Sequence, residues 1–196
     1  MKRYIVPIIA VLFLAISVPS QAAPWQIDPD HSSFQFKVCH LMVSNVKGDF
    51  NKVRGVVTID EHDITNLKVE LIIDAASVDT GHAKRDEHLR GSDFFDVAKY
   101  PTITFVSKKV MKASPDRLQV IGDLTLHGVT KEITVDVEGP TSEIKDPWGN
   151  FRRGATATAK VNRKDFGLTW NRVLETGGVV VGEDVDILVE LELIKK

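Results

Sequence analysis

Apolar and polar residues alternate along nearly every ordered-looking segment between Phe34 and Leu193, and helical spacing is almost absent. Phe34, Phe36, Val38 and His40 would share one face of a strand, and the same period of two returns at 67–73, 118–126, 133–137 and 185–193. Successive side chains of a strand point to opposite faces, so each segment has one apolar and one polar side. Many such strands can bury their apolar faces by closing into a sandwich or a barrel.

Turn signals rich in Gly, Pro, Asp and Asn separate these segments at short intervals. If one segment continues its neighbour, the pattern predicts an all-β fold: an eight-stranded antiparallel β-barrel, whose interior holds either side chains or one slender ligand. The predicted segments lie near 34–40, 43–50, 53–60, 67–74, 101–110, 117–126, 131–138, 153–161 and 184–194.

One long interruption separates the early strands from the later ones, between Asp79 and Tyr100. Strong helix formers run from Ala83 to Arg90 and Gly91 follows them, so we expect one short helix in the 80–92 region. Because this helix has almost no apolar stripe, it is expected to be solvated or to cover one end of the barrel. Phe94 and Phe95 follow and are expected to pack back into the barrel.

Low side-chain bulk in two strands favours a pocket over a filled interior. Gly122 stands in the middle of a strand, where glycine often marks the close approach of a ligand or another backbone. The 153–161 strand is low in bulk on both faces. The face expected to point inward has small or polar residues, Gly154, Thr156, Thr158, Lys160 and Asn162, and the other face has Ala155, Ala157, Ala159 and Val161. The alternative is that Gly122 forms a bulge and that the alanine face packs beneath the helix.

The first 22 residues have the layout of a secretory signal peptide. Lys2 and Arg3 precede an apolar stretch, and Ser20 and Ala22 are the small residues that a signal peptidase reads. The alternative is an uncleaved membrane anchor, for which the apolar stretch is short. We expect cleavage after Ala22 and a periplasmic protein, with residues 1–22 as the signal and 23–196 as one domain of 196 − 22 = 174 residues.

Charge and cysteine content narrow the possible partners. Without Lys2 and Arg3 the chain has 23 basic and 27 acidic residues, a net charge of −4, and no basic cluster with interleaved aromatic residues, which argues against nucleic acid. Cys39 is the only cysteine, so an exported chain would have no internal disulfide. Stability must then come from apolar burial and sheet hydrogen bonds.

Six short motifs occur in one order along the chain, and together they are specific. The motifs are Trp25–Ser32 leading into Phe34–His40, Gly48–Phe50, Arg85–Leu89 after Asp79-Thr80, Asp93–Asp96 leading to Tyr100–Phe105, Gly122–Lys131, and Asn162–Leu168. With these motifs in this order, the chain resembles the YceI-like family of bacterial periplasmic proteins over essentially all of residues 23–196. Only the segment between Trp170 and Val185 has no motif to match.

The resemblance implies a lipocalin-like barrel that holds a polyisoprenoid chain, such as an isoprenoid quinone or a polyprenyl lipid, in an apolar pore. The ligand would be bound non-covalently, with no other cofactor, and a membrane would be its donor or acceptor. The candidate pore residues are Phe34, Phe36, Val38, Phe50, Phe94, Phe95, Ile103, Phe105, Gly122, Leu124 and Leu126.

Polar residues near the expected pore are candidates for binding a ligand headgroup, and each has a structural alternative. His40 could bind a quinone oxygen or a phosphate, or could be a core histidine bonded to a backbone carbonyl. Arg85 and His88 share a helix face, which could meet an anionic headgroup or only solvent. Asn162 and Arg163 could clamp a headgroup, although an ion pair of Arg163 with a nearby carboxylate, Asp165, is favoured.

Catalytic and metal-binding motifs are missing from the sequence. It has no Gly-x-Ser-x-Gly elbow, no Cys-x-x-Cys-His and no His-Glu-x-x-His, and its six histidines are scattered. We therefore expect a binding protein and no metal site, rather than an enzyme. The alternative is an enzyme or redox partner that acts on a bound isoprenoid quinone. The sequence leaves open whether two barrels pair as a homodimer through an exposed strand edge.

Overall fold

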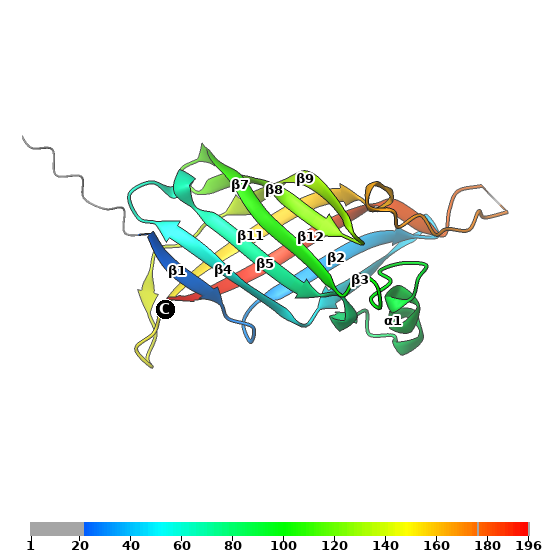
Figure 1. Ribbon diagram of the computed structural model, residues 1–196, viewed down its shortest axis with the longest axis horizontal. Helices are drawn as coiled ribbons and strands as arrows, with labels where there is room; N and C mark the ends of the chain where they lie inside the picture. Colours follow the sequence, from blue (N-terminus) through cyan, green and yellow to red (C-terminus); the bar gives the residue numbers. More distant parts are fainter. Residues whose placement is uncertain (1–21, 176, 196) are drawn as a thin grey trace, which may run out of the picture.

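The computed structural model describes residues 22–175 and 177–195, which form one continuous antiparallel sheet with a single α-helix (Figure 1). Three short 3-10 helices at Ile64–Asn66, Ala75–Ser77 and Arg163–Phe166 lie between strands. The elements are β1 (Ala22–Ile27), β2 (Ser33–His40), β3 (Ser44–Phe50), β4 (Val53–Asp60), β5 (Lys68–Asp74), β6 (Val78–Asp79), α1 (Ala83–Arg90), β7 (Thr102–Ser114), β8 (Arg117–Leu126), β9 (Val129–Glu138), β10 (Ile144–Lys145), β11 (Phe151–Asn162) and β12 (Val181–Lys195).

Eight strands close into a barrel in the order β11-β9-β8-β7-β5-β4-β1-β12, because β12 pairs back with β11. The closing pair is long and runs without interruption from Arg152 opposite Ile194 to Asn162 opposite Asp184. An all-β antiparallel barrel with one short helix is therefore confirmed. The long helix-free ring gives the molecule its elongated shape in Figure 1.

The edge of β12 that faces away from β11 pairs with two strands. The last residues of β12 pair with β1, and the stretch from Val181 to Glu190 pairs with β2, with a bulge between Val181 and Val185. β3 and β6 extend the sheet from β2, so these three strands form a flap at the end of the barrel where α1 lies (Figure 1).

All nine expected segments form separate strands, so the expected merger of two neighbours is wrong. The eight-strand count is correct for a different reason: β2 and β3 lie outside the closed ring, and β1 enters it. The sequence did not predict β1, because this strand is short and adjoins the expected signal peptide. Within it Trp25 has no exposed surface and pairs with both Val57 and Lys195.

The helix α1 is held by charged side chains rather than by an apolar face. Arg85 donates to the Thr80 hydroxyl at 2.7 Å and to the Thr80 carbonyl at 2.9 Å, and the buried Asp86 accepts from the Thr80 backbone N–H at 2.9 Å. Arg90 donates to the carbonyls of Ala76 and Val78. An eight-residue helix is not stable in isolation, so these bonds fix its position.

The predicted signal peptide lies outside the described residues, except for Ala22, which opens β1. Among the described helices, none combines the length and apolar character needed to cross a membrane.

Candidate functional site: a cavity inside the barrel

The barrel encloses a cavity of about 390 Å³, within the range of small-molecule sites. Its wall is made mainly of aliphatic and aromatic side chains from the strands of the closed ring and from β2 and β3 of the flap. Phe94 and Phe95, which follow α1, also border it, and Phe95 meets Phe50 edge to face with ring centroids 5.5 Å apart. The residues after the helix thus pack into the barrel, as predicted.

The space in the cavity comes from small side chains on β11. Ala155, Ala157, Ala159 and Val161 border the cavity, while Lys160 on the opposite face is exposed. The alanine face therefore lies against the cavity and not beneath the helix, and the face of Gly154 and Thr156, which was expected to point inward, is the outer one. On the facing strands the side chains are large, so β11 is where the barrel leaves space for a slender ligand.

Ten of the eleven candidate pore residues border this one cavity: Phe34, Phe36, Val38, Phe50, Phe94, Phe95, Ile103, Phe105, Leu124 and Leu126. Gly122 is the exception, because the ring of Phe105 covers it. A Cβ at position 122 would lie 2.5 Å from Phe105 Cζ and 2.6 Å from the Val106 carbonyl oxygen. Gly122 accommodates a neighbouring side chain and not a ligand.

Further wall residues were not named from the sequence, although they follow the same alternation. They include the inward positions of β5, β9 and β12, among them Leu71, Val135, Ile187 and Leu191. Trp170 gave no signal, because it lies in the 170–185 segment that has no recognisable pattern. The alternation would have identified the strand residues had it been applied to every strand.

Polar side chains gather at the end of the cavity beside α1. His40 from β2, Arg85 and His88 from α1, and Arg163 after β11 all border it. The rings of His88, Phe94 and Trp170 form an aromatic triad with centroid separations of 5.0, 5.1 and 5.2 Å. This end of the cavity therefore combines flat apolar surfaces with hydrogen-bonding groups.

Arg163 is buried and serves a structural purpose. Its guanidinium donates to the backbone carbonyls of Gly182 at 2.7 Å, Val181 at 3.2 Å and Leu168, so it joins the end of β11 to the start of β12. The ion pair with Asp165 favoured from the sequence is not formed. Burial lowers the pKa of Arg163.

Asn162 does not border the cavity, contrary to expectation. Its side-chain oxygen accepts from the Lys164 backbone N–H at 2.9 Å and caps the 3-10 helix Arg163–Phe166. Asparagine is favoured at such caps because its side chain satisfies a free N–H at the first turn.

His40 and Arg85 retain hydrogen-bonding capacity toward the cavity. Within the described part of the chain, the His40 ring has no hydrogen-bond partner, so the alternative of a histidine bonded to a carbonyl is not seen. Two nitrogens of Arg85 bind Thr80, and Nη1 has no partner among the described residues. His88 bonds Asp93 at 2.9 Å through Nε2.

Three potential metal ligands lie close together at the opposite end of the barrel: Asp28, His31 and Glu192. Arg152 occupies the space between the carboxylates: it donates to Asp28 at 2.7 Å, to Glu192, and to Asp146 at 2.6 Å. A guanidinium among the carboxylates satisfies their charge, so this group forms an ionic clasp between strands. We call Arg152, Asp28, Asp146 and Glu192 the clasp.

The clasp shifts the ionisation of its members. Hydrogen bonding from Arg152 is the main reason that the pKa of Asp146 falls to about 2. Burial by itself would raise the pKa of Asp28, but hydrogen bonds from Arg152 and His31 outweigh burial and lower it. The hydrogen bond to Asp28 raises the pKa of His31.

Comparison with known proteins agrees with this architecture. A UPF0312 protein of Vibrio vulnificus is 40% identical over 170 residues, covering 86% of this chain and 89% of that protein. The crystal structure of the Campylobacter jejuni YCEI protein is 33% identical and superimposes with a TM-score of 0.68, over 82% of this chain and 91% of that one.

Two more distant structures share the fold. BcnA of Burkholderia cenocepacia is 23% identical, with a TM-score of 0.72 over 85% of this chain and 98% of that one. A domain from Saccharophagus degradans, described as polyisoprenoid binding, is 18% identical, with a TM-score of 0.63 over 90% of this chain and all of its own. Residues 25–193 match the profile of the YceI-like domain, and the chain belongs to the YceI-like family.

Proposed function

We propose that this protein binds a polyisoprenoid chain, such as an isoprenoid quinone or a polyprenyl lipid, inside the barrel and carries or stores it in the periplasm. The observation that carries the proposal is a largely apolar cavity with the side chains of His40, Arg85, His88 and Arg163 gathered at one end. A long apolar tail with a small polar head has the same distribution of chemistry. The description of the Saccharophagus degradans domain as polyisoprenoid binding supports the proposal.

The free energy of transfer favours a carrier. Burying a chain on the order of 40 carbons at ~0.8 kcal/mol per methylene gives a gross gain of ~30 kcal/mol relative to water. A bilayer offers the same chain an equally apolar environment, so moving it between bilayer and barrel is close to neutral. A protein with that balance can both accept and release its ligand.

The polar contacts favour binding over catalysis. Arg163 is engaged by three carbonyls, and Arg85 and His88 are held by Thr80 and Asp93. These side chains hold the end of the barrel in place and leave Arg85 Nη1, His88 Nδ1 and the His40 ring, which have no hydrogen-bond partner among the described residues, to meet a headgroup. The alternative of a quinone-converting enzyme gains no support from this arrangement.

The test is native mass spectrometry of protein purified after export, with identification of the extracted lipid. Ala157→Leu should fill the cavity from the side of β11, where the side chains are small, and should reduce lipid occupancy, while circular dichroism shows an unchanged β-sheet. Lys160→Leu is the matched control, because it adds the same side chain to the outer face of the same strand. Equal lipid occupancy in both well-folded variants would place the ligand outside this cavity.

A further inference from the structure

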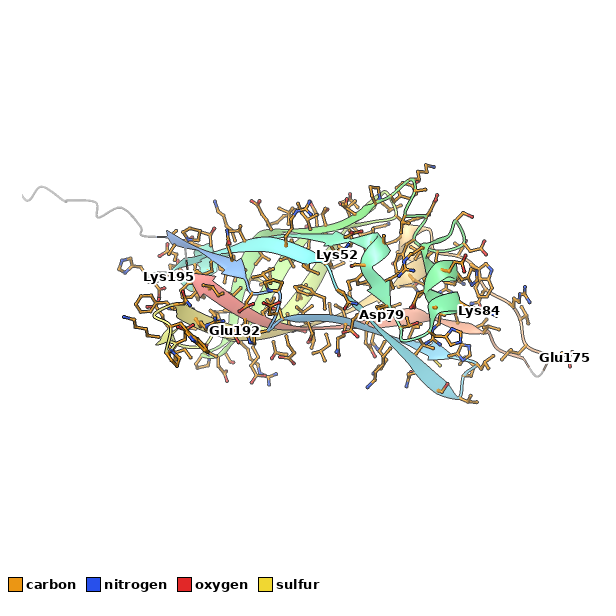
Figure 2. All side chains as sticks on the ribbon, turned by 90° about the horizontal axis from the view of Figure 1, so that it is seen from below. Lys52, Asp79, Lys84, Glu175, Glu192 and Lys195 are labelled. Carbon is orange, nitrogen blue, oxygen red and sulfur yellow. The ribbon has the colours of Figure 1, made fainter. Side chains whose placement is uncertain are left out.

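Four exposed apolar side chains form a projection at the end of the molecule beside α1. Met42 is 60% exposed, and Val43 and Val173 are each 83% exposed; Leu41 completes the group, which we call the apolar tip. Leu41–Val43 form the turn between β2 and β3, and Val173 lies on the segment before β12. Figure 2 shows Glu175 of that segment beyond the end of the barrel, on the side of Lys84 and opposite Lys195.

The two segments that carry the tip are in contact. The backbone N–H of Leu41 donates to the Val180 carbonyl at 2.8 Å. A Cβ at Gly178 would lie 3.2 Å from Met42 Cγ, so the Met42 side chain rests on the neighbouring segment. The tip is therefore one surface built by two segments far apart in sequence.

Folding does not account for the side chains in the β2–β3 turn. Leu41 and Met42 have φ values of +52° and +61°, in the left-handed region that L-residues with large side chains rarely adopt. Hairpin turns with this backbone favour Asn and Gly. Leu and Met at these positions strain the backbone of the turn and remain exposed, so they neither stabilise the turn nor pack in the core.

The tip adjoins the end of the cavity beside α1. Cys39 and His40 border the cavity immediately before Leu41, and Val180 and Val181 border it on the other segment. A ligand that leaves at the α1 end passes the bases of both segments. The exposed apolar side chains thus stand where an apolar chain would enter or leave the protein.

We propose that the apolar tip inserts into the surface of a lipid bilayer and places the α1 end of the cavity against the membrane. The inference rests on the proposed function, because it gives the bound chain a route that avoids water. The turn from Leu41 to Val46 has no charged residue, and Lys47 and Arg172 flank the tip, as suits contact with anionic lipid headgroups. The segment of Val173 also has one exposed acidic residue, Glu175.

A second copy of the chain is a weaker occupant. A stable protein interface buries about 800 Å² on each partner and uses about 20–30 residues a side, whereas the tip offers four side chains on two turns. Shallow insertion into a bilayer needs only a few apolar side chains, because the lipid surface adapts to their shape.

The test replaces the turn with residues that its backbone prefers. Leu41→Asn, Met42→Gly, Val43→Thr removes the apolar surface and relieves the left-handed strain. Trp148→Ser is the control, since Trp148 is 82% exposed but lies on the β10–β11 turn at the opposite end. Flotation with vesicles of phosphatidylethanolamine and phosphatidylglycerol measures binding, and the rate at which a polyprenyl lipid moves from protein to vesicles measures transfer.

The turn variant should bind vesicles at least about ten-fold more weakly and transfer lipid more slowly, while its melting temperature is equal or higher. Trp148→Ser should behave like the unchanged protein. Equal vesicle binding in the turn variant would overturn the proposal, and so would loss of binding in Trp148→Ser alone. A dimer that disappears with the turn substitutions would assign the tip to a second copy instead.

Native mass spectrometry of the same samples separates this proposal from the proposed function. A lipid-filled turn variant that no longer binds vesicles supports both. A protein that contains no lipid but binds vesicles through the tip refutes the carrier and leaves the membrane contact standing.

Discussion

The ring of Phe105 lies directly over the Cα of Gly122 on the neighbouring strand, so close that a Cβ on residue 122 would come within 2.5 Å of it. The glycine leaves room for the end of the aromatic ring, which a side chain at position 122 would displace. The absence of a side chain at position 122 therefore helps to set the width of the cavity through the position of Phe105.

Gly122→Ala should destabilise the protein by about 1–3 kcal/mol, the usual range for overpacking. The ring can move, but the Val106 carbonyl oxygen at 2.6 Å belongs to the sheet and cannot. Gly154→Ala on β11 is the control, because its nearest heavy atom would be at an ordinary 3.7 Å. Chemical denaturation measures both, and equal stability of the two variants would contradict this account of Gly122.

The barrel and most of its cavity wall could be predicted from the sequence, because the period of two assigns every strand an inner and an outer face. The low bulk of the 153–161 strand indicated where the space lies, although the inner face is that of Ala155, Ala157 and Ala159 and not the expected face of Gly154 and Thr156. Contacts that depend on exact placement could not be predicted: the partners of Arg163 are backbone carbonyls up to 19 residues away, and the cover over Gly122 depends on one ring orientation. Trp170 was missed because no periodic pattern surrounds it.

Export should remove the signal peptide without damaging the barrel. We expect the intact mass of periplasmic protein to correspond to a chain that begins at Ala23 or within a residue or two of it. Cleavage there preserves Trp25, which is fully buried between β4 and β12. A mass that includes Met1, or protein found only in the cytoplasm, would contradict the proposed compartment.

His88→Phe should separate headgroup binding from structural support. Phenylalanine preserves the packing against Phe94 and Trp170 and loses only the bond to Asp93, which joins two half-exposed side chains and is worth about 0–1 kcal/mol. The empty protein should therefore keep its melting temperature to within about 4 °C. A lipid with a polar headgroup should dissociate faster, measured by native mass spectrometry over time.

One control variant and one control ligand test this prediction. His62→Phe, on an exposed turn away from the α1 end, is the control and should leave dissociation unchanged. If His88→Phe accelerates the loss of a hydrocarbon without a headgroup to the same extent, the histidine acts only through packing. The polar contacts should then be sought at His40 and Arg85 Nη1.

The clasp should make stability fall in acid. The pKa of Asp146 is about 2 in the folded protein against an ordinary value of 3.8, so the unfolded chain takes up its proton first as the pH falls. The stabilisation is complete above pH ~4 and is lost as the pH falls toward ~2, and Asp28, whose pKa is also lowered, acts in the same direction. His31 has a raised pKa, so its contribution is present below its ordinary pKa of 6.5 and is lost as the pH rises above that value.

Asp146→Asn tests this assignment, because asparagine can still accept the backbone N–H bonds of Trp148 and Asn150 that shape the turn. The variant should melt at a lower temperature near neutral pH and should lose less stability than the unchanged protein between pH ~4 and ~2. Asp184→Asn, exposed on β12, should leave the profile unchanged. An unaltered acid slope in Asp146→Asn would show that other carboxylates control acid unfolding and that Arg152 gains its stabilising effect from Asp28 and Glu192.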